Sequence, residues 1–258
     1  MSSCEGHEPD RSAGHENTAS PVSLMFDVIG APAEAFENLR RNRYRSVNWV
    51  WPGVLVVVIG IIGGLLVWDQ PAIRQQMSDI VSEQVERQVS KMGMTEDQRA
   101  VAERFGLVMA RTSMLLDPVV TGFVMPFWWG LVIWVAGSKL LGGNFTYLKG
   151  VEVAGLANTV VALELAARAL LQVGFGNIMA GPHLGILVRE FDPAKPGHAA
   201  LAVLNVFSLW AVVIRGYGMA RVGGFPCWKG IVVLLLLWLL FMCGGIGVSV
   251  VGQRLAGH

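Results

Sequence analysis

The apolar residues of this chain fall into long blocks separated by polar segments. Five blocks reach the roughly 20 residues that an α-helix needs to cross the ~30 Å hydrocarbon layer of a bilayer. They cover residues 50–68, 118–141, 151–173, 199–222 and 230–251. Lipid offers the backbone no hydrogen-bond partner, so each spanning segment must be a helix. The pattern predicts an all-α polytopic membrane protein, a bundle of five transmembrane helices.

Residues 70–116, between the first two blocks, show a different pattern. Apolar residues recur there at helical spacing: Ile73, Met77, Ile80, Val81, Val85, Val89 and Met92. Gly93 ends the run, and Thr95 followed by Gln98 is typical of a capping box that begins a second helix. We expect an amphipathic helical hairpin between the first two spans, covering the outer face of the bundle. Two solvated helices packed on each other would give the same spacing.

The chain before the first block divides into two parts. Residues 1–22 are polar and resemble neither a signal peptide nor a span, so we expect a disordered tail. Residues 23–46 contain a Pro that can open a helix, Pro32, with Phe36 and Leu39 near one face. We expect a juxtamembrane helix lying at the bilayer surface, followed by a cluster of arginines and then by the membrane domain, 47–252.

The arginine cluster predicts the orientation of the chain. Its members are Arg40, Arg41, Arg43 and Arg45. Basic residues close to the end of the first span usually stay on the cytoplasmic side. We therefore expect a multi-pass protein of the cell (cytoplasmic or inner) membrane, with its N-terminus in the cytoplasm and, after five spans, its C-terminus outside.

Composition narrows the function classes. Of the 258 residues 53% are hydrophobic and 15% charged, and the net charge is +1. No basic patch with interleaved aromatic residues is present, which argues against nucleic-acid binding. The cysteines, Cys4, Cys227 and Cys243, form no CxxC pair. One loop holds His183, Glu190, Asp192 and His198, but their irregular spacing favours a solvated loop over a metal site. We expect no metal and no cofactor.

The third block carries polar residues that are expensive in lipid. An unpaired charge at mid-membrane costs about 2.5–3.5 kcal/mol on insertion scales. Glu164 and Arg168 are four residues apart, so they share a helix face and can pair. Asn158 can hydrogen-bond a neighbouring helix, and Arg215 of the fourth block can snorkel or reach Glu164. We expect Glu152 at the membrane interface.

Glu164, Arg168, Arg215 and Asn158 support two interpretations. The first is a structural polar cluster with an internal ion pair. The second is a relay or substrate pathway, because intramembrane ionisable residues are often functional. We favour the structural cluster, since a partner one turn away already explains the charge on Glu164.

Catalysis has weak support in the sequence. Glu164 to Arg168 matches half of the Glu-Glu-xxx-Arg motif of intramembrane CAAX-type proteases, but position 163 is Leu and no second base or metal ligand is suitably spaced. Nothing is then available to activate a water molecule. The GxSG arrangement of rhomboid-type proteases is absent too. We expect no enzyme and no catalytic residue, and a degenerate protease is the weakest alternative.

Three stretches carry a family resemblance. They are SLMFDVIGAPAEAFENLRR, GGNFTYLKGVEVAGLAN and NVFSLWAVVIRGYGMARVGGFPCWKGIVVLLL. Together their layout resembles the bacterial branch of the Ypt/Rab-interacting protein (Yip) domain family, over residues 22–251. The resemblance implies five spans, a cytoplasmic N-terminus and a non-enzymatic role in membrane organisation or trafficking.

The leading functional hypothesis is therefore a scaffold or accessory subunit that acts through helix contacts. Its expected partners are the lipid bilayer, other integral membrane proteins and, in a homo-oligomer, a second copy. The main alternative is a small transporter or channel that uses Glu164, Arg168 and Arg215 as an intramembrane pathway.

Overall fold

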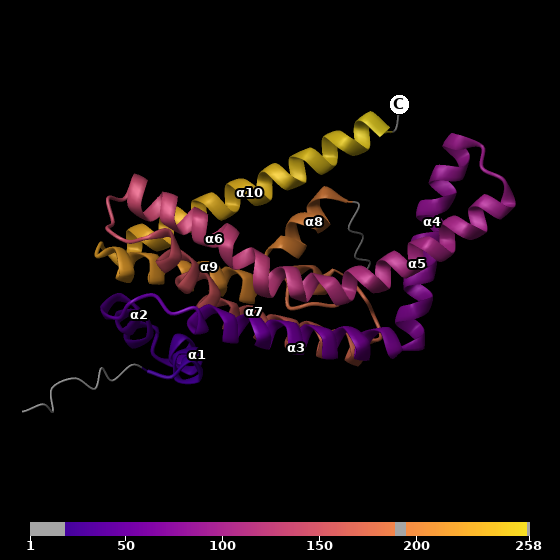
Figure 1. The fold of residues 1–258 in the computed structure, drawn as a ribbon. Helices are drawn as coiled ribbons and strands as arrows, with labels where there is room; N and C mark the ends of the chain where they lie inside the picture. The colour runs from indigo at the N-terminus through magenta and orange to yellow at the C-terminus, as the bar shows by residue number, and fades with distance from the viewer. Residues whose placement is uncertain (1–18, 189–194, 257–258) are drawn as a thin grey trace, which may run out of the picture.

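The computed structural model describes residues 19–188 and 195–256, and within them it is helical with no strand (Figure 1). The helices are α1 (Pro21–Gly30), α2 (Pro32–Arg41), α3 (Val47–Asp69), α4 (Pro71–Met92), α5 (Glu96–Val119), α6 (Met125–Trp134), α7 (Tyr147–Phe175), α8 (Pro196–Val203), α9 (Val206–Gly223) and α10 (Cys227–Ala256). Residues 1–18 of the expected disordered tail, 1–22, lie outside the described residues. Helix α1 begins at Pro21, within the last part of that tail.

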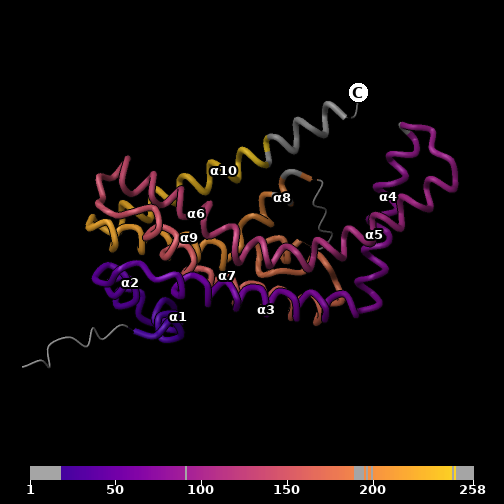
Figure 2. The backbone as a smooth tube through the Cα atoms, in the orientation of Figure 1, coloured from indigo at the N-terminus to yellow at the C-terminus, as the bar shows by residue number. Residues whose placement is uncertain are grey.

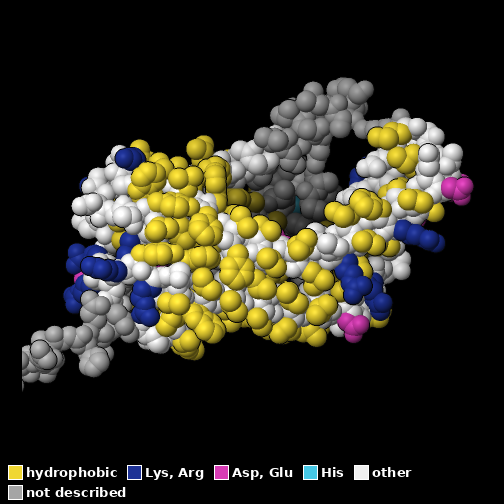
Figure 3. All heavy atoms as spheres, viewed as in Figure 1, with side chains coloured by type: hydrophobic (Ala, Val, Ile, Leu, Met, Phe, Trp, Pro, Cys, Tyr) yellow, Lys and Arg dark blue, Asp and Glu magenta, His cyan; other side chains and the backbone are white. Residues whose placement is uncertain are grey.

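The long helices lie roughly side by side and define two ends (Figure 1). We call the end with α1, α2 and residues 40–45, 141–146 and 224–226 the arginine end. The opposite end, where α4 and α5 project, is the hairpin end. In the view of Figure 3, hydrophobic side chains cover the middle of the bundle and basic side chains gather toward both ends. This is the distribution that a bilayer-spanning protein requires.

Four described helices are long and apolar enough to cross a membrane. They are Val47–Asp69, Glu96–Leu140, Tyr147–Phe175 and Cys227–Gly245. The predicted polytopic, all-α class is confirmed. Helix α9 packs between α7 and α10, but it is shorter and carries two arginines, Arg215 and Arg221. The count of five spans stays a prediction.

The second span does not begin at Pro118 as expected. Helix α5 runs through Pro118 into a π-helical segment, Val120–Val124, and on into α6 and a second π segment, Val135–Leu140. Proline lacks the N–H that an α-helical turn needs, and a π segment is one way for the helix to continue past it. Hairpin and span are therefore one helix of 45 residues.

The hairpin is confirmed, together with its sequence signals. Thr95 and Gln98 form the reciprocal capping box that begins α5. Gly93 ends α4 with φ of 63°, a left-handed conformation that glycine adopts readily. That the hairpin covers the outer face of the bundle stays a prediction. Its tip projects beyond the hairpin end (Figures 1 and 2), and Gln76 joins its base to the loop after α7 through Gly176 O and Ile178 N.

The helices before the first span bury their apolar faces against protein. Leu24, Val28, Ala35, Phe36 and Leu39 are each at most 1% exposed. Phe36 packs at Gly218 of α9, where an added Cβ would lie 2.6 Å from its ring. The apolar side of α2 therefore faces the small residues of α9, and its position at the bilayer surface stays a prediction.

The predicted block 199–222 is two helices. Helix α8 ends at Val203, and Asn205 begins α9 by accepting hydrogen bonds from the N–H groups of Phe207 and Ser208. Residues 182–184 run beside 204–206, where Leu184 N donates to Leu204 O and Val206 N to Pro182 O. Hydropathy does not detect this break, because one Asn among apolar residues hardly changes a window average.

Candidate functional site

Helix α7 is the centre of the bundle. Every residue from Gly150 to Val160 is buried, and α7 contacts α1, α2, α3, α6 and α9. Small residues permit this packing. A Cβ on Gly150 would lie 2.6 Å from Gly130 O of α6, and one on Gly155 would overlap Trp49 of α3. Polar side chains of α7 therefore meet other helices instead of lipid.

The first polar cluster of α7 surrounds Glu164, which is 7% exposed. Its Oε1 accepts from Arg168 Nη2 at 2.5 Å and from Asn205 Nδ2 at 2.8 Å, and its Oε2 accepts from Ser208 Oγ at 3.1 Å. Glu164 is eleven residues, or about 16 Å, before the end of α7. The entry to α9 therefore lies at the depth of mid-helix. Hydrogen bonds from a charged and two neutral donors are what a carboxylate needs in a low-dielectric site.

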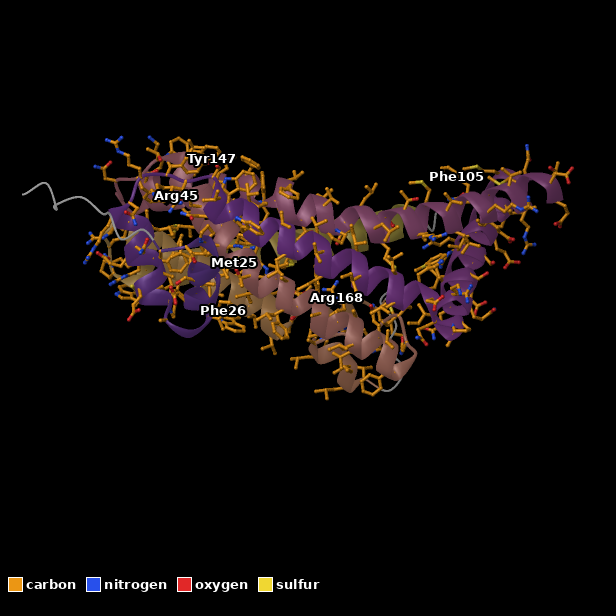
Figure 4. The ribbon with its side chains drawn as sticks, turned by 60° about the horizontal axis from the view of Figure 1, so that its bottom comes forward. Met25, Phe26, Arg45, Phe105, Tyr147 and Arg168 are labelled. Carbon is orange, nitrogen blue, oxygen red and sulfur yellow. The ribbon has the colours of Figure 1, made fainter. Side chains whose placement is uncertain are left out.

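Arg168 itself lies at the edge of the bundle. Its side chain is 43% exposed, and Figure 4 labels it on α7, toward the hairpin end from Arg45 and Tyr147. It lines a cavity of about 720 Å³ between α3, α4, α5 and α7, together with Gln172 and Asp117. Neither Glu164 nor Arg215 lines this cavity, so among the described residues it does not continue into the centre of the bundle.

Arg215 does not meet Glu164 as we considered from the sequence. Its Nη2 donates to Asn158 Oδ1 at 3.3 Å, and its guanidinium lies 4.6 Å from the centroid of the Trp129 ring. Asn158 Nδ2 in turn donates to Thr121 O, 3.2 Å away in the π segment after α5. No carboxylate of the described residues lies within 4.0 Å of Arg215, which is 6% exposed. A cation–π contact offsets part of its desolvation.

A second polar cluster, which sequence reasoning missed, surrounds Glu152. This residue is fully buried. Its Oε1 accepts from Arg45 N at 2.9 Å and Asn48 Nδ2 at 2.8 Å, and its Oε2 lies 2.6 Å from Lys149 Nζ. Lys149 also donates to Leu39 O at 2.8 Å. The cluster joins α2, the start of α3 and α7. The sequence did contain a signal for this cluster. Lys149 and Glu152 are three residues apart, so they share one helix face and can pair.

The four arginines expected to set the orientation lie together at the arginine end. Arg40 and Arg41 pair with Glu37 at 2.8 and 2.9 Å. Their hydrogen bonds lower the pKa of Glu37 to about 2. Arg45 contributes its backbone N–H to Glu152, and Arg43 has no ion-pair partner among the described residues.

The loop considered for a metal site is only partly described. No group of three or more His, Cys, Asp or Glu side chains among the described residues could hold a metal ion. His183 and His198 are described, whereas Glu190 and Asp192 lie outside the described residues.

Comparison with known proteins matches the chain almost end to end. A family model described as the Yip1 domain matches residues 26–248. The membrane protein YknW of Bacillus subtilis (strain 168) is 23% identical over 227 residues, which cover 87% of this chain and 89% of that protein. No solved structure matches.

Proposed function

The chain belongs to the Yip1 domain family of membrane proteins, and from that premise we propose that it is a non-enzymatic scaffold or accessory subunit. It holds other integral membrane proteins through helix contacts and contributes to membrane organisation or trafficking. We place it in the cytoplasmic (inner) membrane, with the arginine end and the N-terminus in the cytoplasm and the C-terminus outside.

The observation that carries this proposal is the closed environment of Glu164. Both carboxylate oxygens accept hydrogen bonds from the chain's own Arg168, Asn205 and Ser208. Two segments that are distant in sequence, α7 and the start of α9, are thereby held together at mid-bundle. A carboxylate that accepts three hydrogen bonds from its own chain is held between helices, so we infer a structural role for Glu164 and no catalytic residue.

Helix α10 supplies the contact surface of the scaffold. Its first half packs on α9, where Gly230 meets Gly216, and Figure 1 shows the helix diverging from the bundle toward its C-terminal end. Gly244, Gly245 and Gly247 have no neighbour within 4 Å of an added Cβ. Small residues let the backbones of two membrane helices approach closely. We infer that this face receives a helix of another membrane protein or of a second copy.

The charge pair gives the sharpest test. The variants are Glu164→Gln, Arg168→Met and the double variant, each measured for membrane-fraction yield and for proton and chloride flux in reconstituted vesicles. A structural pair predicts low yield for each single variant and recovery in the double variant, because the double change leaves no unpaired buried charge. Normal yield with altered flux in all three would overturn the scaffold proposal.

The α10 surface has its own test with a matched control. Gly245→Trp places a large side chain on the open face, and Leu170→Trp places one on α7 where Leu170 is already 74% exposed. Chains that co-elute with the intact protein in mild detergent should be lost from the first variant and kept by the second. Equal retention by both would remove α10 as the contact surface.

A small transporter or channel is the second candidate, and one observation favours it. Arg215 is buried with no carboxylate within 4.0 Å among the described residues, and an unneutralised cation in a membrane protein often marks a pathway. The variant Arg215→Met separates the two functions. A conduit loses flux while keeping its yield, whereas a scaffold keeps its yield and has no flux to lose.

A further inference from the structure

A cationic cavity lies at the arginine end, separate from the polar clusters inside the bundle. It has a volume of about 550 Å³, within the range of roughly 300–1,000 Å³ usual for small-molecule sites. Three segments form it: the link from α2 to α3, the loop and first turn of α7, and the turn between α9 and α10. Its polar lining residues are Arg40, Arg43, Tyr44, Asn144, Thr146 and Lys149. None of its described lining residues is acidic.

The positive charge of this cavity is only partly neutralised. Arg40 donates two hydrogen bonds to Glu37, and Lys149 pairs with Glu152 below the cavity. Arg43 has no ion-pair partner among the described residues and is solvent-exposed. Arg41 and Arg221 share Glu37 with Arg40, so one carboxylate serves three guanidinium groups. The cavity therefore has an excess of positive charge.

Neutral donors add to this site. The Tyr44 hydroxyl accepts from Trp49 Nε1 at 2.9 Å, which leaves its own proton free to donate. The amide of Asn144 lines the same cavity and takes part in no described hydrogen bond. Guanidinium, hydroxyl and amide donors are the groups that bind phosphate oxygens.

Exposed apolar residues lie close to the cavity's lining residues along the chain. Leu148, beside Lys149, is 43% exposed, and Leu140, just before the loop that carries Asn144, is 66% exposed. A soluble anion needs only the charged groups, whereas a phospholipid needs charged groups and an apolar surface side by side. The position at one end of membrane-crossing helices provides both.

We propose that this cavity binds the phosphodiester headgroup of an anionic phospholipid, with the acyl chains on the adjoining surface at Leu140 and Leu148. Arg43 supplies the unneutralised charge, and Arg40, Tyr44 and Asn144 orient the phosphate. Basic pockets between membrane helices bind anionic headgroups in the same way. The site is independent of the partner surface on α10.

The test uses the delipidated full-length protein in a neutral detergent. Short-chain phosphatidylglycerol, short-chain phosphatidylcholine and inorganic phosphate are titrated separately, and binding is followed by the shift in thermal unfolding and by native mass spectrometry. We expect saturable binding of phosphatidylglycerol, and none of phosphatidylcholine or inorganic phosphate at the same concentrations. Equal binding of the two lipids overturns the proposal, and so does binding of inorganic phosphate alone.

Two variants locate the binding. Arg43→Gln should weaken phosphatidylglycerol binding about fivefold, the effect of one basic residue near an anionic lipid surface. Arg104→Gln removes the same charge from an exposed position on α5 and should leave binding unchanged. Both side chains are exposed, so both variants fold, and circular dichroism verifies this. Unchanged binding in Arg43→Gln, or equal losses in both variants, overturns the assignment. Neither flux nor co-elution enters the readout, so the scaffold proposal is tested separately.

Discussion

Helices α7 and α10 are both long enough to cross a bilayer, yet they occupy opposite positions in the bundle. Over their most apolar 18-residue windows α7 has a mean hydropathy of 1.4 and is 56% buried, whereas α10 has 2.2 and is only 17% buried. The less apolar helix is central and the more apolar one is peripheral. Lipid solvates apolar side chains, so only polar groups require protein around them. Of these two helices, the more polar one is the more buried.

The largest difference between the two helices should follow from removing a lysine. Lys149→Met on α7 leaves the buried Glu152 carboxylate without its cation, at a cost of about 3–5 kcal/mol in unfolding free energy. Lys229→Met on α10 loses only a contact with the Trp228 ring at 5.8 Å, worth about 1 kcal/mol or less. Tryptophan fluorescence during unfolding in mixed detergent and SDS micelles measures both.

A rescue variant makes this prediction stricter. Lys149→Met with Glu152→Gln removes both charges and should regain most of the lost stability. If the unfolding free energy of Lys149→Met lies within about 1 kcal/mol of the parent value, the Glu152 cluster does not hold α7 in place.

A methyl group added to each helix should have unequal effects. Gly155→Ala on α7 would overlap Trp49, and overpacking of this kind costs about 1–3 kcal/mol. Gly245→Ala on α10 meets no atom within 4 Å and gains helix propensity, so stability should be unchanged or slightly higher. The same unfolding measurement distinguishes them, and similar losses in both would show that α10 is packed as tightly as α7.

Removing a neutral polar group should have a smaller effect. Asn158→Ala on α7 deletes the hydrogen bond to Thr121 O and the acceptor for Arg215, and such interhelical bonds are worth about 0.6–2 kcal/mol. Cys243→Ala truncates an exposed side chain of α10 and should leave stability unchanged. A loss in Cys243→Ala as large as in Asn158→Ala would contradict the comparison.

The smallest effect should appear in acid. The pKa of Glu37 falls from 4.5 to about 2 on folding because Arg40 and Arg41 donate to it. A lowered pKa contributes stability that is present above pH about 4.5 and is lost as the pH falls toward 2. The difference between the parent and Glu37→Gln, measured from pH 7 to 3, should therefore shrink only below pH about 4.5. Glu34→Gln is the control for lost charge.

Acid should leave α10 unchanged, because α10 contains no Asp or Glu. A Cys-reactive probe at Cys243 should report no local change between pH 7 and 3 while the packing of α2 on α9 loosens. A pH-dependent signal at Cys243 would contradict this separation.

Hydropathy predicted the class of the fold and the hairpin, because long apolar blocks and the Thr95 capping box are local signals. The continuation of α5 and the break before α9 depend instead on packing between helices. A proline usually ends a helix, yet α5 continues through Pro118. There it packs against Gly60 of α3, a long-range contact that the local sequence does not predict. The break before α9 depends on Asn205, whose amide is held by Glu164 from another helix.

The polar residues show the same limit. Glu164 and Arg168 are one turn apart, so their pairing was predictable from helix geometry. Asn205 and Ser208 reach Glu164 only through the tertiary fold. The burial of Glu152 was not predictable either, because Arg45 N and Asn48 approach it from the link before α3 and the first turn of α3, over a hundred residues earlier.

The continuous helix of 45 residues from Glu96 to Leu140 has a mechanical consequence. Its contour length is about 68 Å at 1.5 Å per residue, and it passes without a non-helical break from its exposed part through Pro118 and Val120–Val124 into its membrane part. A force on the hairpin tip is therefore transmitted along this helix to the contact between Gly122 and Gly53 of α3. A displacement outside the bilayer then changes helix packing inside it.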